Sequence, residues 1–233
     1  MLNEILTDCR AWTSETIDVS SEWSYALSEG CLSVIDAQSL KENPKPISEV
    51  VVSDAVRDTC NVCLQPVRAA LRAGRGFAIV ERIPVERYTL EEAQMAYWIM
   101  GQCLGIPIEQ NIEGTVLYDV RDTGRDVKEG ARFSVTNAES SFHTDGAFGT
   151  PVPEQVGLLC IHTARSGGRS QLISAYALHN ALLKDYPEVL ETLYEPFCFD
   201  RRGQFLPGED PIKRTPIFTW DEQVLYLRYL NYY

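Results

Sequence analysis

The chain has 233 residues, 45% of them apolar, and a formal net charge of −12. Because nucleic acids and anionic membranes are bound through clusters of Lys and Arg, so acidic a chain is expected to bind neither. It has no apolar run of the roughly 20 residues that a transmembrane helix needs, and its start lacks the pattern of a secretory signal. The seven cysteines are scattered and odd in number, which is typical of reduced thiols, and we expect a cytoplasmic protein.

The first 75 residues are predicted to be mainly helical. Apolar residues recur at helical spacing over 53–72, and Gly74 is the expected end of this helix. Cys60 and Cys63 lie in the apolar stripe. A redox or zinc site would need a second pair of cysteines or an exposed helix start, and neither is visible in the sequence. Both residues are therefore expected to pack in the core.

A buried strand is predicted over 76–80, and a second helix follows it. Thr89 and Glu92 have the spacing of a capping box, which opens a helix that runs to about Leu104, with Gly105 just beyond.

From Thr115 onward the pattern changes to short strands. Seven strand candidates are separated by turn residues, and the segment 220–223 has the composition of a hairpin turn. A helical segment over about 176–194, interrupted at Pro187, lies between the fourth and the fifth candidate. Many short strands with one helical insertion predict a mainly β fold with flanking helices, of the jelly-roll or barrel type. The candidates are residues 116–120, 141–148, 156–162, 171–174, 196–200, 216–220 and 224–229.

His143 and Asp145 carry the clearest chemical signal. They are two residues apart on a predicted strand, so their side chains share one face while Thr144 points to the other. An imidazole and a carboxylate side by side can supply two of the three protein ligands of a mononuclear iron(II) site. Because 33 of the 233 residues are acidic, a His with an acid two positions later also arises by chance, so the flanking sequence has to decide.

The sequence around this pair resembles the taurine dioxygenase/clavaminate synthase-like family of iron(II)- and 2-oxoglutarate-dependent oxygenases. The resemblance covers about residues 75–233. It implies a double-stranded β-helix (jelly roll) and a single catalytic domain over 1–233, with a helical N-terminal part (1–75) and a jelly-roll core (76–233). The segments that carry it are the strand over 76–80, the helix over 89–104, the motif Phe142-His143-Thr144-Asp145, the strand over 153–159, the segment Gly167-Gly168-Arg169-Ser170 and the helix from about Tyr176.

The resemblance also implies the cofactors and the reaction. His143 and Asp145 would bind iron(II), and the remaining metal positions would take 2-oxoglutarate and O2. Ser170 stands where the family has a Thr that contacts the carboxylate of 2-oxoglutarate; a plain turn residue after two glycines is the alternative. Family members that halogenate have Gly or Ala in place of the carboxylate, so Asp145 implies hydroxylation or a related oxidation. The substrate is expected to be a small polar molecule, amino-acid-like or otherwise anionic.

Two expected residues of the family are missing from the chain. Its second iron-binding His and the Arg that binds 2-oxoglutarate lie far after the first His, so both are expected beyond Tyr233, and the jelly roll is expected to be C-terminally incomplete. His162 and His179 are expected to be structural or surface residues. Arg228, on the last strand candidate, either lies at the rim in water or turns into the barrel mouth, where its planar fork would bind a substrate carboxylate.

Two other functions stay open at this point. The chain could be a non-catalytic jelly-roll binding module with an incomplete metal site, although such a module has no need of both His143 and Asp145. It could also be a hydrolase that uses this pair for zinc or manganese, in which the Gly-Gly-x-Ser segment would have no role. The sequence also leaves open whether the protein forms a homo-oligomer.

Overall fold

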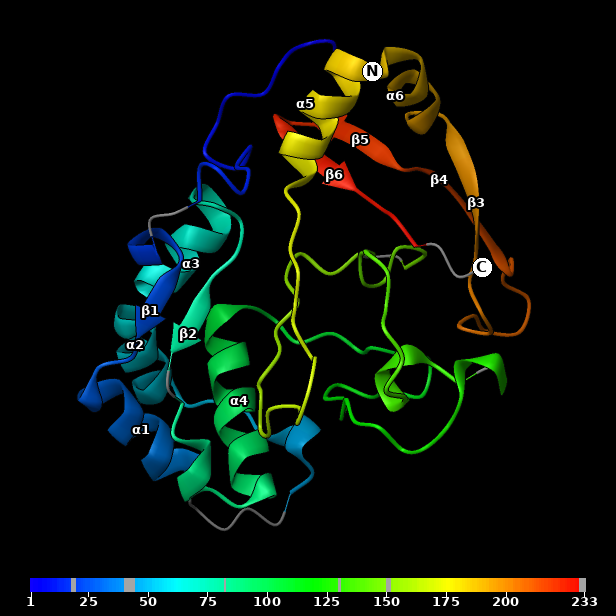
Figure 1. The fold of residues 1–233 in the computed structure, drawn as a ribbon. Helices are drawn as coiled ribbons and strands as arrows, with labels where there is room; N and C mark the ends of the chain where they lie inside the picture. The colour runs from blue at the N-terminus through cyan, green and yellow to red at the C-terminus, as the bar shows by residue number, and fades with distance from the viewer. Residues whose placement is uncertain (18–19, 40–44, 82, 130, 150–151, 231–233) are drawn as a thin grey trace. The chain divides into compact units, whose positions relative to one another are not determined.

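The computed structural model describes residues 1–17, 20–39, 45–81, 83–129, 131–149 and 152–230 (Figure 1). These residues divide into two compact units. One, here called the helical unit, contains residues 2–107 and 155–190. The other, here called the hairpin unit, contains Met1 and residues 108–154 and 191–233. The single catalytic domain expected from the sequence stays a prediction.

The described part of the helical unit contains five complete α-helices and a short parallel pair of strands. In the pair, Ser24 lies opposite Ile79. Helices α1, α2 and α4 pack against one another (Figure 1). The elements are η1 (Ser20–Glu22), β1 (Ser24–Ala26), α1 (Glu29–Ser39), η2 (Ile47–Glu49), α2 (Asp54–Cys63), α3 (Gln65–Ala73), β2 (Ile79–Glu81), η3 (Val85–Arg87), α4 (Leu90–Leu104) and α5 (Ala175–Asp185). Helix α6 (Pro187–Leu193) begins in this unit and ends in the hairpin unit.

One apolar core holds α1, α2, α3 and α4 together. Its buried members recur at helical spacing, as amphipathic helices require, and Cys60 is among them, as predicted. The helix expected over 53–72 is two helices, because Pro66 in the first turn of α3 has no backbone N–H with which to continue α2. The core residues are Cys31, Ile35, Val52, Cys60, Leu64, Val67, Ala96, Ile99, Met100 and Cys103.

Two local signals in the sequence are confirmed. Thr89 and Glu92 form the capping box of α4, with both reciprocal hydrogen bonds present, and α4 ends at Leu104. Gly74 ends α3, and a Cβ atom at this position would lie 2.8 Å from the Cα atom of Ala70. No side chain fits there without a shift of the backbone, which explains the glycine.

A disulfide between Cys31 and Cys63 links α1 to the end of α2. The expectation that all seven cysteines are reduced thiols is therefore wrong for these two. The residues are 32 positions apart in sequence, and only the packing of α1 on α2 brings their Cα atoms to 6.2 Å. Cys9, Cys60, Cys103, Cys160 and Cys198 are free thiols.

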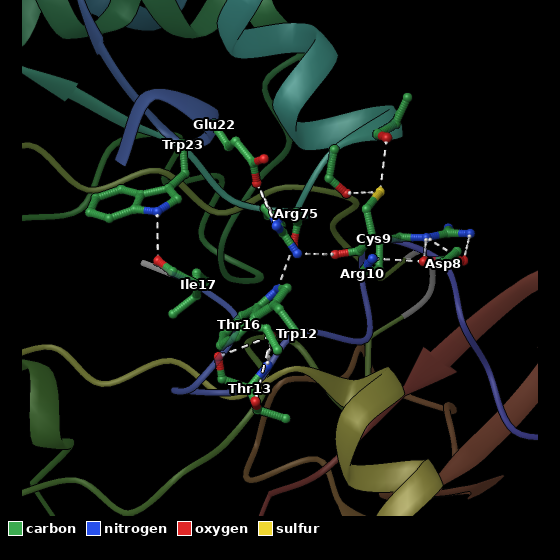
Figure 2. Close-up of polar contacts among 12 residues, drawn as sticks. Asp8, Cys9, Arg10, Trp12, Thr13, Thr16, Ile17, Glu22, Trp23 and Arg75 are labelled. Atoms are coloured by element: carbon green, nitrogen blue, oxygen red, sulfur yellow. Dashed lines mark hydrogen bonds and ion pairs between the residues drawn. The ribbon is translucent and has the colours of Figure 1, made fainter. Parts of the chain in front are cut away.

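The N-terminal segment of the helical unit is fastened along the end of α3. Figure 2 shows the side chain of Arg75 between Glu22 and the backbone of Cys9. Its Nε donates to the Glu22 carboxylate at 2.7 Å, and the Trp12 indole N–H donates to the Arg75 carbonyl at 2.8 Å. The same segment reaches α5, because the guanidinium of Arg10 lies 4.4 Å from the centre of the Tyr176 ring.

The hairpin unit contains two separate antiparallel hairpins. Strand β3 (Pro196–Asp200) pairs with β4 (Ile212–Pro216), and β5 (Phe218–Asp221) pairs with β6 (Val224–Leu227). The turn between β5 and β6 was expected, and Glu222 and Gln223 both have positive φ there, 45° and 70°. Left-handed backbone at two successive residues suits a two-residue hairpin turn. Two short helices, η4 (Val127–Glu129) and η5 (Phe133–Val135), complete the described part of this unit.

Four of the seven strand predictions are wrong in this structure: the segments 116–120, 141–148, 156–162 and 171–174 are irregular. The expected strand over 76–80 is reduced to β2, and β4 was not expected. A strand exists only where a neighbouring backbone accepts and donates its hydrogen bonds, and the described residues offer these segments no ladder partner. The described strands therefore form three two-stranded sheets and no closed barrel. None of the described helices has the length and apolarity to cross a membrane.

Candidate metal site

His143 and Asp145 converge in the hairpin unit. Nε2 of His143 lies 3.4 Å from Oδ1 of Asp145, and the two side chains are 33% and 55% exposed. Two ligand atoms that each bind one metal ion at about 2.0–2.2 Å, at right angles to each other, are about 3 Å apart. The observed separation is close to this value, and both side chains are partly exposed.

The imidazole of His143 is held in the tautomer that a metal ligand needs. Its Nδ1 lies 2.8 Å from the carbonyl oxygen of Ser141, with Oγ of Ser140 at 3.3 Å. Because a carbonyl only accepts, Nδ1 carries the proton of this hydrogen bond, and in the neutral imidazole the lone pair is then on Nε2. Metal-bound histidines commonly have their other nitrogen engaged in this way.

The local backbone differs from the prediction that His143 and Asp145 lie on a strand. The segment is irregular as far as Thr144 and then forms a turn from Asp145 to Phe148, which is closed by a 2.7 Å hydrogen bond from the Gly149 N–H to the Gly146 carbonyl. Gly146 has a φ of 62°, which favours glycine. The strand prediction is wrong, but the side chains still converge as expected.

The end of β6 and the residues after it lie against this motif. The Thr144 N–H donates to the Tyr229 carbonyl at 2.7 Å, and the Tyr229 N–H donates to Oγ1 of Thr144 at 2.9 Å. Nη1 of Arg228 donates to the carbonyls of Ala147 and Gly149, each at 3.3 Å. Arg228 is half-buried, and this burial lowers the pKa of its guanidinium. The guanidinium of Arg228 thus faces the turn that follows Asp145. Its expected place, at the rim or in the mouth of a barrel, stays a prediction, because the described strands form no barrel.

Thr144 and Tyr229 were not expected to take part in the site. Alternation along the predicted strand placed the side chain of Thr144 on the face opposite His143 and Asp145. Its hydrogen-bond partner Tyr229 is 85 residues later in the sequence, so no local pattern could identify it.

Ser170 belongs to the helical unit and is exposed. It follows Gly167 and Gly168, which both have left-handed backbone, with φ of 73° and 68°. A Cβ atom on Gly168 would also lie 2.8 Å from the Cβ atom of Ala164, so the two glycines are required by the turn itself. The contact of Ser170 with 2-oxoglutarate stays a prediction.

The other two histidines are placed as the sequence suggested. His162 is exposed on an irregular segment, and His179 is fully buried in α5. Burial lowers the pKa of His179. In the described ranges, no group of three or more His, Cys, Asp or Glu side chains is arranged to hold a metal ion. His143 and Asp145 are thus a pair of candidate ligands and not a complete set.

Comparison with known proteins confirms the resemblance inferred from these motifs. Residues 53–232 match the model of a family described as taurine catabolism dioxygenase TauD, TfdA family. Members of this family are iron(II)- and 2-oxoglutarate-dependent oxygenases with a jelly-roll fold.

Two curated proteins are similar to the chain. FR-33289 synthase of Streptomyces rubellomurinus (strain ATCC 31215) is 28% identical over 233 residues, which cover 98% of this chain and 67% of that protein. The taurine hydroxylase-like protein SAT17 of Stachybotrys chartarum (strain CBS 109288 / IBT 7711) is 32% identical over 84 residues, which cover 36% of this chain and 20% of that protein. The chain thus spans part of the length of each relative.

Proposed function

This chain belongs to the TauD/TfdA family of taurine dioxygenase-like proteins, and on that premise we propose that it carries the metal-binding motif of an iron(II)- and 2-oxoglutarate-dependent dioxygenase. The reaction is the hydroxylation, or a related oxidation, of an unactivated C–H bond in a small polar, amino-acid-like or otherwise anionic molecule. The observation that carries the proposal is the approach of His143 Nε2 to Asp145 Oδ1 at 3.4 Å, with Nδ1 of His143 already engaged by Ser141.

Each residue has a distinct role in this proposal. His143 and Asp145 hold iron(II) through a neutral nitrogen and a carboxylate, the ligand types of the two-His-one-carboxylate triad. When bound, iron(II), 2-oxoglutarate and O2 supply the oxidising power for C–H cleavage, with succinate and carbon dioxide as co-products. Ser170 contacts a carboxylate of 2-oxoglutarate through its hydroxyl.

Arg228 is the proposed anchor for an anionic substrate. Its Nη1 is held by two carbonyls of the turn after Asp145, so the guanidinium has a defined direction beside the metal motif. A guanidinium keeps its charge at all physiological pH values and recognises carboxylates and sulfonates through several N–H groups. In a chain with a net charge of −12, such a local cation is what an anionic substrate requires.

The alternative of a non-catalytic binding module is not favoured. The family consists of oxygenases, and this chain retains two ligand side chains that converge. The observations also give no support to a zinc or manganese hydrolase, in which the Gly-Gly-x-Ser segment has no role.

The test is the formation of succinate from 2-oxoglutarate by the complete protein, supplied with iron(II) and ascorbate. Taurine, a small sulfonate named in the family description, is the first substrate probe, followed by a panel of amino acids and other carboxylates. His143→Ala should abolish turnover, whereas His162→Ala, which removes an exposed histidine elsewhere, should not. Turnover that survives the loss of His143 would refute the proposal.

A further inference from the structure

The two candidate metal ligands flank a residue that is fastened to a distant part of the chain. Thr144 lies between His143 and Asp145 and exchanges hydrogen bonds with Tyr229 through both its backbone N–H and its side-chain oxygen. The Thr144 hydroxyl also lies 3.3 Å from the Tyr229 carbonyl. The backbone between the two ligands is thus held at a fixed place by a segment 85 residues later in sequence.

Arg228, the neighbour of Tyr229, holds the other end of the motif. Its Nη1 donates to the Ala147 and Gly149 carbonyls, which stand on either side of Phe148. The backbone N–H of Arg228 itself donates to the Ile217 carbonyl at 2.8 Å, so the segment is attached to the β5–β6 hairpin. Residues 228–229 therefore connect a regular hairpin to an irregular ligand-bearing turn.

We propose that Thr144 and Arg228 are positioning residues that set the separation of His143 Nε2 and Asp145 Oδ1 for the metal, with the 228–229 segment as their support. The inference rests on the proposed function. A turn without strand neighbours does not hold two side chains in one geometry by itself. Metal ligands need to be fixed to within about 0.5 Å, and loss of a residue that orients a ligand commonly costs about 10- to 100-fold in metal affinity.

The inference is tested by metal affinity, which does not require turnover. Binding of Mn²⁺ to the complete protein is followed through the electron paramagnetic resonance signal of the unbound ion. Thr144→Val keeps the shape of the side chain but cannot accept from the Tyr229 N–H, and its dissociation constant should rise about tenfold or more. Thr144→Ser keeps the hydroxyl and should restore affinity to near the wild-type value.

Arg228→Lys gives an independent second variant. Lys keeps the charge but lacks the planar guanidinium, whose Nη1 donates to two carbonyls. It should also weaken Mn²⁺ binding, and it decides the question if Thr144→Val does not fold. Arg201→Lys is the matched control, since Arg201 Nη1 donates to the Asp210 carbonyl at 3.1 Å in the β3–β4 loop. This control should leave the affinity unchanged.

The outcomes separate this inference from the proposed function. If the wild-type protein does not bind Mn²⁺, or if His143→Ala binds it equally well, the proposed metal site itself fails. If His143→Ala loses the metal while folded Thr144→Val and Arg228→Lys bind it like the wild type, the positioning role is overturned and the metal site stands. If Arg228→Lys raises the KM for substrate and leaves the Mn²⁺ affinity unchanged, Arg228 is a substrate anchor and not a positioning residue.

Discussion

Asn180 and Leu6 exchange two hydrogen bonds across 174 residues of sequence. The Leu6 N–H donates to Oδ1 of Asn180 at 2.8 Å, and Nδ2 of Asn180 donates to the Leu6 carbonyl at 2.7 Å. The side-chain amide of Asn180 thus pairs with both backbone groups of Leu6, as a neighbouring strand would. This contact holds the N-terminal segment against α5, the helix that contains the buried His179.

Acidification is expected to destabilise the protein through His179. Burial lowers the pKa of this residue in the folded state, and in the unfolded chain it takes up a proton near pH 6.5. As pH falls through this range the unfolded state binds more protons than the folded state, so the free energy of unfolding decreases. The side chain in His179→Gln cannot titrate, so this variant does not share the loss of stability. As pH falls from 7.5 to 5.5, the free energy of unfolding of the wild type should therefore move toward that of the variant. In chemical denaturation at several pH values, a constant difference between the two proteins would contradict this account. His162→Gln, at an exposed histidine, is the control.

The Cys31–Cys63 disulfide is expected to stabilise the protein considerably. It closes a loop over a sequence separation of 32, for which restriction of the unfolded chain corresponds to roughly 3–4 kcal/mol. Cys31→Ser, or reduction of the wild type with dithiothreitol, should lower the Tm by roughly 10 °C. Cys160→Ser, at an exposed free thiol, should not change it. Equal Tm values for oxidised and reduced protein would show that the disulfide contributes nothing.

Replacement of Asp145 by Gly should abolish hydroxylation by the complete protein. The variant loses the only carboxylate of the candidate pair, and a single imidazole holds a metal far less tightly than an imidazole with a carboxylate. Product analysis by mass spectrometry, with iron(II) and 2-oxoglutarate supplied, checks this expectation. Glu154→Gly removes an exposed acid of the same unit and should retain activity. Unchanged hydroxylation in the Asp145 variant would show that this residue is not a ligand.

Ser170→Ala should raise the KM for 2-oxoglutarate. The loss of one hydrogen bond to a charged group costs about 1.5–3 kcal/mol, which corresponds to roughly ten- to a hundredfold in affinity. Ser170→Thr keeps the hydroxyl and should behave like the wild type. Ser166→Ala, in the same exposed segment, is the control. A KM that is the same in the Ala variant would assign Ser170 to the turn alone.

The parts of the fold that the sequence predicted well are those whose hydrogen bonds close within a few residues. The capping box of Thr89 and Glu92, the end of α3 at Gly74 and the turn at Glu222 and Gln223 all depend on neighbours in the chain. The break in the helical segment at Pro187 was predicted for the same reason, since proline lacks an N–H. The pairing of His143 with Asp145 is also a local feature, and it was found from a spacing of two residues.

What the sequence could not predict are contacts that join distant segments. Whether the segment 141–148 becomes a strand depends on a partner backbone, and the structure gives it a turn and a two-point contact with Tyr229 instead. The Cys31–Cys63 disulfide and the contact of Arg228 with the turn after Asp145 arise in the same way.

By itself, the sequence determined helix α4, the β5–β6 turn, the family and the two candidate metal ligands, because each depends on residue types at short spacing. Only the tertiary structure decided which residues hold those ligands in place. The hydrogen bonds of Thr144 and Arg228 form only after the chain has closed over some eighty residues, and that closure depends on the packing of the whole unit and not on any local pattern.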